Sequence, residues 1–231
     1  MKTLIIQHDA ADPPALAGDV VNQLGHTVQI LRLDRGDEIP TETDAQLLMT
    51  FGGGFSLALE KPPPWVEREC RLVRWMAEQQ RRVLGICLGS QLVAKALGAT
   101  VTRNAEPEVG WHPVRRTESA KGRIAECFPA GDLTVFHWHR DTFGIPPAAD
   151  HILRSNGCHH QGFVIDDRIV GLQFHLEASA KTVTTFMAVS QLWRKQAAHV
   201  QPREEIERGI ETYLPRQREV LTDLLSTLTL S

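Results

Sequence analysis

The sequence predicts an α/β protein with a mostly parallel sheet, helices on both faces of that sheet, and a small antiparallel addition. In the N-terminal part, short apolar runs alternate with segments of helical periodicity, which is typical of parallel strands joined by crossover helices. Residues 101–170 have short strand patterns and turns instead, which predict antiparallel strands attached to the sheet. A chain of 231 residues is long enough to bury a substantial core.

The predicted elements follow one another at regular intervals. Apolar or alternating runs predict strands at residues 3–7, 28–33, 46–51 and 83–86. Helical spacing predicts helices at about 14–24, 66–76 and 88–96. The alternating pattern at 28–33 indicates a strand near the edge of the sheet. Helical periodicity returns after Lys181, and about 199–231 is predicted to be a C-terminal helical extension that is broken at Pro215.

Composition excludes several classes of protein. The formal net charge is -3 and no run of Lys or Arg stands out, so we expect no nucleic-acid or anionic membrane surface. No apolar stretch approaches the roughly 20 residues that span a bilayer, and the N-terminus lacks a secretory signal pattern. The four cysteines show no CxxC pairing and do not suggest a disulfide scaffold. The sequence therefore predicts a cytoplasmic protein with reduced thiols.

The sharpest local signal is Gly85-Ile86-Cys87-Leu88-Gly89, which lies between a predicted strand and a predicted helix. This is the context of a nucleophile elbow, where a strained turn lifts a reactive side chain out of the sheet. Flanking glycines remove Cβ clashes in such a turn, and the start of a helix favours a thiolate. The alternative is a buried structural cysteine. The glycines favour the nucleophile for Cys87, and the structural interpretation is retained for Cys70, Cys127 and Cys158.

A cysteine nucleophile needs a proton acceptor that later serves as a donor. His175 and Glu177 are two residues apart, so at the end of a strand their side chains project to the same side. The glutamate can then orient the imidazole toward the thiol. A polar pair at an exposed strand end is the alternative, and only the elbow makes the catalytic interpretation preferable.

Three segments, GICLGSQ, QFHLE and FGGGFS, resemble class I glutamine amidotransferase domains, especially the GMP-synthase-like branch. The resemblance extends through residues 108–111 and 137–141 and covers roughly 3–190. It implies a flavodoxin-like doubly wound sheet, with residues 1–231 forming a single domain of this type. It also implies that Cys87 attacks a γ-carboxamide, forms a γ-glutamyl thioester and releases ammonia, after which water hydrolyses the thioester. No cofactor is implied.

The same resemblance assigns roles to further residues. Gly53 and Leu88 correspond to the positions whose backbone N–H groups bind the oxyanion. Gln91 matches a glutamine that helps hold the substrate, and the segment around Trp138 and His139 corresponds to backbone that contacts the substrate. Gly54 departs from the family pattern, since many relatives have proline there, and this predicts a more mobile oxyanion loop.

A metal site is an alternative use of the histidine-rich middle segment. The candidate ligands are His137, His139, His151, Cys158, His159 and His160. Zinc sites with reliable spacing usually pair their ligands across short turns twice, and the sequence has no second clean pair. We therefore predict no metal, with His139 and Asp141 lining or bracing the substrate pocket.

Three interpretations of function remain open. The first is a glutamine amidotransferase that hydrolyses glutamine or passes ammonia to a separate synthetase, because no synthetase or P-loop is recognisable in the sequence. The second is a hydrolase of another γ-glutamyl amine or peptide. The third is a catalytically idle protein with a regulatory or binding role, which the intact Cys87, His175 and Glu177 disfavour. An apolar leucine stripe near the C-terminus indicates packing on the body of the protein or a homodimer face.

Overall fold

The computed structural model describes residues 1–58 and 61–230, and within them nine strands form one sheet. The strands are β1 Lys2–Gln7, β2 Thr27–Arg32, β3 Leu47–Thr50, β4 Arg82–Ile86, β5 Val101–Arg116, β6 Leu133–Phe143, β7 Asp150–Arg154, β8 Gly162–Ile165 and β9 Ile169–Leu172. The α-helices are α1 Ala15–Gln23, α2 Pro64–Glu78, α3 Leu88–Ala96, α4 Arg123–Glu126, α5 Ala180–Val189 and α6 Arg203–Thr229. Two short 3-10 helices are η1 Leu33–Arg35 and η2 Leu192–Arg194.

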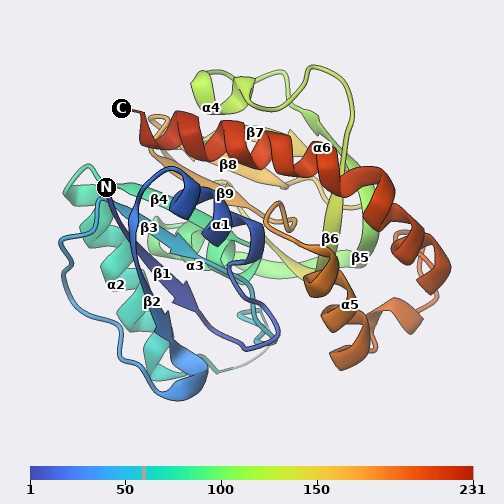
Figure 1. The fold of residues 1–231 in the computed structure, drawn as a ribbon, viewed down its shortest axis with the longest axis horizontal. Coiled ribbons are helices and arrows are strands. Elements are labelled where there is room, and N and C mark those ends of the chain that lie inside the picture. Colours follow the sequence, from blue (N-terminus) through green and yellow to red (C-terminus); the bar gives the residue numbers. More distant parts are fainter. Residues whose placement is uncertain (59–60, 231) are drawn as a thin grey trace.

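The sheet has a parallel part and an antiparallel part, in the strand order β2-β1-β3-β4-β9-β8-β7-β5-β6. Strands β2, β1, β3, β4 and β9 are parallel neighbours. Every later pairing, from β9 with β8 to β5 with β6, is antiparallel. The predicted antiparallel addition is thus confirmed, and so is the position of the strand at 28–33, which corresponds to edge strand β2 (Figure 1).

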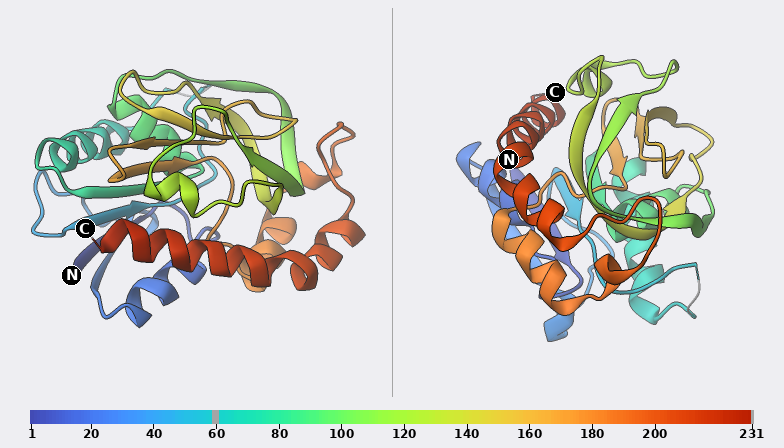
Figure 2. Two further views of the ribbon diagram at one scale, coloured as in Figure 1. Left: turned by 90° about the horizontal axis from the view of Figure 1, so that it is seen from above. Right: turned by 90° about the vertical axis from the view of Figure 1, so that its right-hand side faces the viewer.

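Helices cover both faces of the parallel part, as predicted (Figure 1, Figure 2). Successive residues of β1 alternate between the two layers, because side chains of a strand point to opposite faces. Ile5 packs with α1 and α6, whereas Leu4 and Ile6 pack with α2 and α3. None of the described helices combines the length and apolar character needed to cross a bilayer.

Helix α6 differs from the prediction, because it continues through Pro215 without a break. Proline removes one helical N–H donor and crowds the preceding turn. Pro215 is exposed, so water can satisfy the freed carbonyl. Beyond the proline, Gln217 is buried and accepts the N–H of Phe136 at 3.0 Å, and it donates to the carbonyl of Leu176 at 3.2 Å. The buried stripe of Leu221 and its neighbours then packs on the sheet, so tertiary contacts hold the helix together.

Candidate active site

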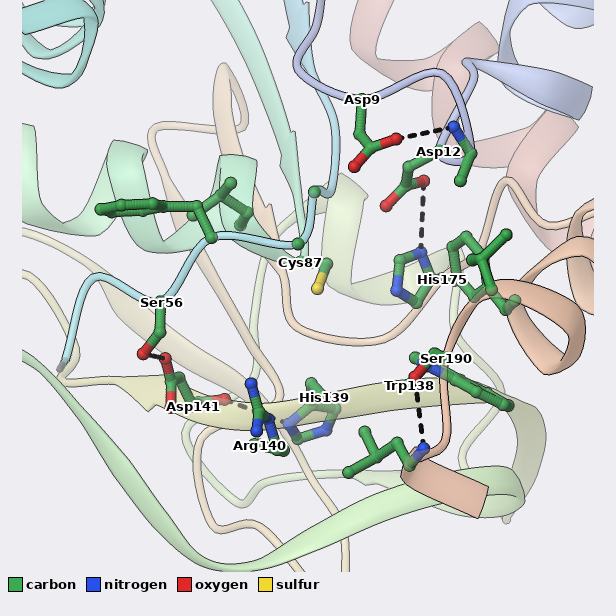
Figure 3. A pocket seen from close by; sticks show the side chains of 18 of the residues that line it. Asp9, Asp12, Ser56, Cys87, Trp138, His139, Arg140, Asp141, His175 and Ser190 are labelled. Atoms are coloured by element: carbon green, nitrogen blue, oxygen red, sulfur yellow. Dashed lines mark hydrogen bonds and ion pairs between the residues drawn. The ribbon is translucent and has the colours of Figure 1, made fainter. Parts of the chain in front are cut away.

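The candidate site lies just beyond the carboxyl ends of β1, β3, β4 and β9, where ligands bind in open α/β sheets. A cavity of about 890 Å³ opens there (Figure 3). The predicted site residues that line it are Gly53, Cys87, Leu88, Gln91, Trp138, His139 and His175. Glu177 is fully buried and contacts the ring of His175 from outside the lining. Residues from distant parts of the chain therefore meet in one pocket.

Cys87 occupies a strained turn between β4 and α3. Its φ of 53° lies in the left-handed region that non-glycine residues rarely adopt. A Cβ at Gly85 would lie 2.7 Å from the carbonyl oxygen of Gly89, and a Cβ at Gly89 would lie 2.2 Å from that of Thr50. The backbone N–H of Cys87 donates to Leu172 at 2.8 Å, which ties the turn to β9. Both elbow glycines are therefore required by close backbone contacts.

His175 and Glu177 come from the loop after β9 and not from a strand end. Because β9 ends at Leu172, the prediction that strand alternation aligns the two side chains is wrong. Hydrogen bonds fix the loop instead: the N–H of His175 donates to Phe136 at 2.8 Å, and the N–H of Leu16 donates to Glu177 at 3.0 Å. In this arrangement Nδ1 of His175 lies 2.8 Å from Oε1 of Glu177.

The other nitrogen of His175 is available for chemistry. Nε2 has no hydrogen-bond partner among the described residues. Figure 3 shows His175 and Cys87 beside each other in the pocket, with one ring nitrogen on the side of Cys87. Burial alone would lower the pKa of His175, but Glu177, Cys87 and Asp12 together raise that pKa well above 6.5. The imidazole is therefore set to hold a proton next to the sulfur.

Asp12, in the loop after β1, is a carboxyl that the sequence analysis did not identify. It lines the pocket, and its Oδ1 lies 4.0 Å from Nδ1 of His175. Burial raises the pKa of Asp12 to about 7. The loop leaves it no spare room, since a Cβ at Gly52 would lie 1.8 Å from Oδ2 of Asp12. In the sequence, Asp12 is marked only by being an acidic residue that follows the first predicted strand.

A second buried pair, His8 and Glu69, braces the loop that carries Gly53. Nδ1 of His8 lies 3.0 Å from the carbonyl oxygen of Phe51 and 3.2 Å from that of Gly52. Nε2 of His8 lies 2.8 Å from Oε2 of Glu69. Both nitrogens thus meet acceptors, as in an imidazolium that donates twice. Burial works against this charge, but Glu69 and the loop carbonyls raise the pKa of His8 above 6.5.

The three remaining predicted residues are held in different ways. Nε2 of Gln91 donates to Oε1 of Gln173 at 3.1 Å, which fixes the amide at the pocket wall. Nε1 of Trp138 donates to Oγ of Ser190 at 3.3 Å. His139 is buried, and its Nε2 points toward Glu108 in the protein interior. The other atoms of its ring border the cavity.

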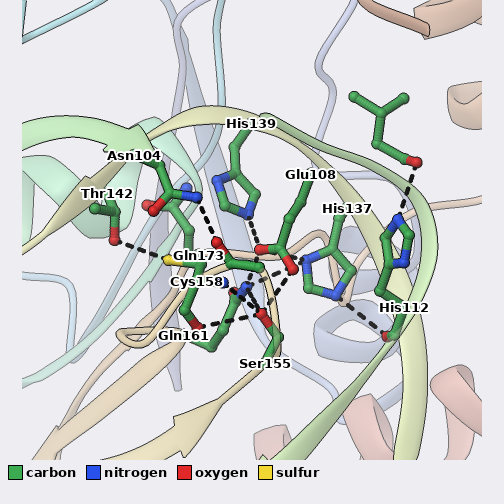
Figure 4. A network of polar contacts seen from close by, with 12 residues as sticks. Asn104, Glu108, His112, His137, His139, Thr142, Ser155, Cys158, Gln161 and Gln173 are labelled. Carbon is green, nitrogen blue, oxygen red and sulfur yellow. Dashed lines mark hydrogen bonds and ion pairs between the residues drawn. The ribbon is translucent and has the colours of Figure 1, made fainter. Parts of the chain in front are cut away.

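A polar network lies behind His139, centred on the carboxylate of Glu108 (Figure 4). Oε2 of Glu108 lies 3.1 Å from Nε2 of His139 and accepts from Gln161 at 2.5 Å, and Oε1 accepts from Ser155 at 2.6 Å. Burial works against the charge of Glu108, but the neighbouring histidines lower the pKa of its carboxyl. Burial lowers the pKa of His137 to about 3, against the attraction of Glu108.

Within residues 1–58 and 61–230, two groups have ligand atoms close enough for one metal ion, within 4.8 Å of each other. One is Glu108, His137 and His139; the other is Asp12, His175 and Glu177. In the first group, the carboxylate already receives hydrogen bonds from protein donors and faces His139. In the second, Glu177 lies 2.8 Å from Nδ1 of His175, and Asp12 lies 4.0 Å from the same nitrogen. Hydrogen bonds and opposite charges within each group therefore explain why its side chains lie close together.

Comparison with known proteins identifies the class. The family model for glutamine amidotransferase class-I matches residues 18–194. The chain therefore belongs to the class I glutamine amidotransferase family, and its predicted flavodoxin-like, doubly wound fold is confirmed. A crystal structure of a glutamine amidotransferase from Methylobacillus flagellatus has a TM-score of 0.90 and 31% identity, covering 98% of this chain and 93% of that one.

Curated relatives in this family differ in their described activities. The glutamine amidotransferase-like protein YfeJ of Salmonella typhimurium is 30% identical, covering 83% of this chain and 82% of that protein. A glutamine-hydrolysing GMP synthase subunit of Sulfurisphaera tokodaii is also 30% identical, over 67% of this chain and 78% of that protein. Gamma-glutamyl peptidase 4 of Arabidopsis thaliana is 27% identical, over 61% and 58% respectively.

Proposed function

We propose that this protein is a cysteine-dependent amidohydrolase that releases ammonia from the γ-carboxamide of glutamine through a thioester on Cys87. The observation that carries the proposal is the arrangement around His175. Glu177 holds one ring nitrogen at 2.8 Å, while the other has no hydrogen-bond partner among the described residues and lies on the side of Cys87. Nucleophile, base and orienting carboxylate need this order of contacts.

The proposed reaction depends on a proton that His175 takes from Cys87 and later donates. The Cys87 thiol gives its proton to Nε2, and the sulfur attacks the carbonyl carbon of the amide. The resulting imidazolium, supported by Glu177, donates that proton to the leaving nitrogen as the C–N bond breaks. A water molecule then gives a proton to His175 and attacks the thioester carbonyl. As the C–S bond breaks, His175 returns this proton to the sulfur, which releases glutamate and regenerates the thiol.

Two backbone N–H groups are proposed to bind the oxyanion that forms in both steps. Leu88 is the first residue of α3, and the first N–H groups of a helix have no partner within it. Gly53 faces Leu88 so closely that a Cβ there would lie 3.2 Å from Cδ2 of Leu88. Losing one such donor costs roughly 3 kcal/mol of transition-state stabilisation in comparable sites.

The α-amino and α-carboxylate groups of the substrate are proposed to bind near Gln91, Trp138 and His139, on the pocket wall beside α3 and β6. Arg140 lines the same cavity and is exposed, so it provides a cation for the α-carboxylate. Asp9 lines the cavity too and offers an acceptor for the ammonium group. A zwitterionic glutamyl group therefore meets complementary charges.

The destination of the ammonia is proposed to be a separate synthetase. The related Sulfurisphaera tokodaii chain is named as one subunit of GMP synthase, so it belongs to an enzyme of more than one chain. Association with a partner in trans, or as a homodimer, would be detected by copurification and by light scattering. An idle regulatory role is the competing proposal, and it predicts no reaction at Cys87.

The test is glutamate release from glutamine together with labelling by a glutamine-analogue electrophile. We expect turnover and a single label on Cys87, both lost in Cys87→Ala. Cys127 is the matched control: it is more exposed than Cys87, and burial raises the pKa of its thiol. Labelling of Cys127 in place of Cys87, or full turnover in Cys87→Ala, would overturn the proposal.

A further inference from the structure

Three histidine rings meet on the hairpin of β7 and β8, outside the lining of the candidate pocket. They belong to His151 on β7 and to His159 and His160 in the loop before β8. The ring centroids of His151 and His159 are 5.0 Å apart, as are those of His159 and His160. Those of His151 and His160 are 5.2 Å apart. The proposed reaction uses none of these rings.

The separations of the three rings match the spacing of imidazoles around one metal ion. Zinc binds imidazole nitrogen at about 2.0–2.1 Å in tetrahedral sites, which places the ring centres of two ligands roughly 5 Å apart. Three imidazoles with the fourth position left open form a recurring zinc ligand set. As the rings stand, their donor nitrogens do not all lie within 4.8 Å of one another, so a bound ion requires a ring to rotate.

Backbone carbonyls determine which nitrogen carries the hydrogen in two of the rings. Nε2 of His151 lies 2.9 Å from the carbonyl oxygens of both Leu153 and His159. Nδ1 of His160 lies 2.8 Å from the carbonyl oxygen of Phe143. Because a carbonyl only accepts, these nitrogens donate, and the lone pairs of the neutral rings lie on Nδ1 of His151 and Nε2 of His160. Histidines that bind metals usually donate their other N–H in this way.

The third ring is free to adjust to an ion. His159 is exposed, and neither of its ring nitrogens has a hydrogen-bond partner among residues 1–58 and 61–230. Turning this ring therefore breaks no hydrogen bond. The register of β7 against β8 is also irregular between His151 and Leu153, and such irregularities in a strand re-aim side chains.

We propose that His151, His159 and His160 bind one divalent transition-metal ion, such as Zn²⁺, with a fourth position open to solvent. Imidazole nitrogen suits Zn²⁺, Cu²⁺ and Ni²⁺, whereas Mg²⁺ and Ca²⁺ require oxygen ligands. Spacing in the sequence predicts no metal, because these ligands come from a strand and from the loop behind it. A bound ion would tie the loop at 155–161 to β7, and the same loop supplies two hydrogen-bond donors to the carboxylate of Glu108.

Zinc binding to the full chain, without a histidine tag, tests the site. Cys87→Ala is the reference protein, because a thiolate and an imidazole in the candidate active site also bind zinc. After removal of metal by a chelator and dialysis, titration against a chromophoric chelator measures affinity and stoichiometry. We expect one tightly bound ion that His159→Ala weakens by roughly 100-fold, since even loss of an outer partner costs about 10- to 100-fold.

His26→Ala in the same background is the matched control. This histidine is half-buried, and its Nδ1 lies 2.8 Å from Oγ1 of Thr3, at the other end of the sheet. It should leave zinc affinity unchanged. Because an ion that binds only the folded protein stabilises it, zinc should raise the urea midpoint of the reference and of His26→Ala, but not that of His159→Ala. Magnesium should raise none of them.

The outcomes decide the site independently of the proposed hydrolysis. Zinc affinity that is unchanged in His159→Ala, or lowered equally in His26→Ala, would overturn the three-histidine site. A urea midpoint that magnesium raises as much as zinc would overturn the assignment to a transition metal. Glutamate release by the wild-type protein is measured separately, so neither result decides the other.

Discussion

Two buried histidine–carboxylate pairs flank the pocket, and they differ in what the second imidazole nitrogen meets. In each pair one ring nitrogen lies 2.8 Å from the carboxylate, Glu177 for His175 and Glu69 for His8. In each, the carboxylate raises the pKa of the ring against the effect of burial. His8 directs its second nitrogen to backbone carbonyls, whereas that of His175 is left for Cys87.

A buried histidine next to a carboxylate is therefore not enough to identify a catalytic group. A closed pair, with both nitrogens bonded, holds a loop in position. An open pair, with one nitrogen facing a cavity and a nucleophile, can move a proton. Substitutions in the two pairs should therefore separate loss of activity from loss of stability, and the following predictions go from the largest expected effect to the smallest.

Replacing the open-pair histidine should have the largest effect on activity. His175→Ala removes both the proton acceptor and the later donor, so we expect kcat/KM to fall by roughly 10⁴-fold or more. His26→Ala is the control, because this half-buried histidine lies outside the pocket lining. Steady-state glutamate release measures both variants, and near-normal turnover in His175→Ala would contradict the assignment.

Replacing the open-pair carboxylate should come next. Glu177→Gln keeps the shape of the side chain but can present an N–H to Nδ1, which favours the wrong tautomer of His175. We expect a loss of roughly 10²- to 10⁴-fold in kcat. Steady-state glutamate release measures this variant too. A kcat within about threefold of wild type would show that Glu177 does not orient the ring.

Replacing the closed-pair carboxylate should affect stability more than activity. Glu69→Gln leaves a buried histidine without its counter-charge, so the free energy of unfolding should fall by about 3 kcal/mol. Because the oxyanion loop is only displaced, kcat of the folded protein should fall by roughly tenfold. Urea unfolding and active-site titration measure the two quantities, and a larger loss of activity than in Glu177→Gln would break the comparison.

Much of this arrangement can be predicted from sequence, because it depends on local rules. Apolar runs and helical spacing predict the layers, and Gly85 reflects a contact within the turn, with the carbonyl oxygen of Gly89. The closed pair joins His8 to Glu69 across 61 positions of sequence, and no local pattern links them. The sequence prediction is wrong for the end of β9 and for the continuity of α6. Tertiary contacts hold both segments, among them hydrogen bonds with Phe136 and the apolar packing of α6.

The pH dependence of stability should also distinguish the closed pair. Since the pKa of His8 is raised above 6.5 in the folded protein, its contribution to the free energy of unfolding is complete below pH 6.5. That contribution is lost as the pH rises through the raised pKa. Urea unfolding at several pH values should show this decline in wild type, and the decline should be smaller in Glu69→Gln. An equal decline in both proteins would show that His8 is not the cause of the decline.

The smallest expected effect concerns Asp12, the carboxyl beside the open pair. Its pKa of about 7 means that it becomes anionic as the pH rises through neutrality, which favours the imidazolium form of His175. We expect kcat/KM of wild type to change by roughly two- to fivefold around pH 7, and Asp12→Asn to abolish that change. A pH profile of both proteins measures it, and an unaltered inflection in the variant would assign the titration to another group.

Trapping the reaction intermediate tests the central claim most directly. If Cys87 is the nucleophile served by His175, acid quenching of the protein during turnover, followed by peptide mass analysis, should find one γ-glutamyl group on the peptide that contains Cys87. Hydroxylamine should remove that group, as expected of a thioester. Sustained glutamate release without any adduct on Cys87, and with equal rates in Cys87→Ala, would contradict the account.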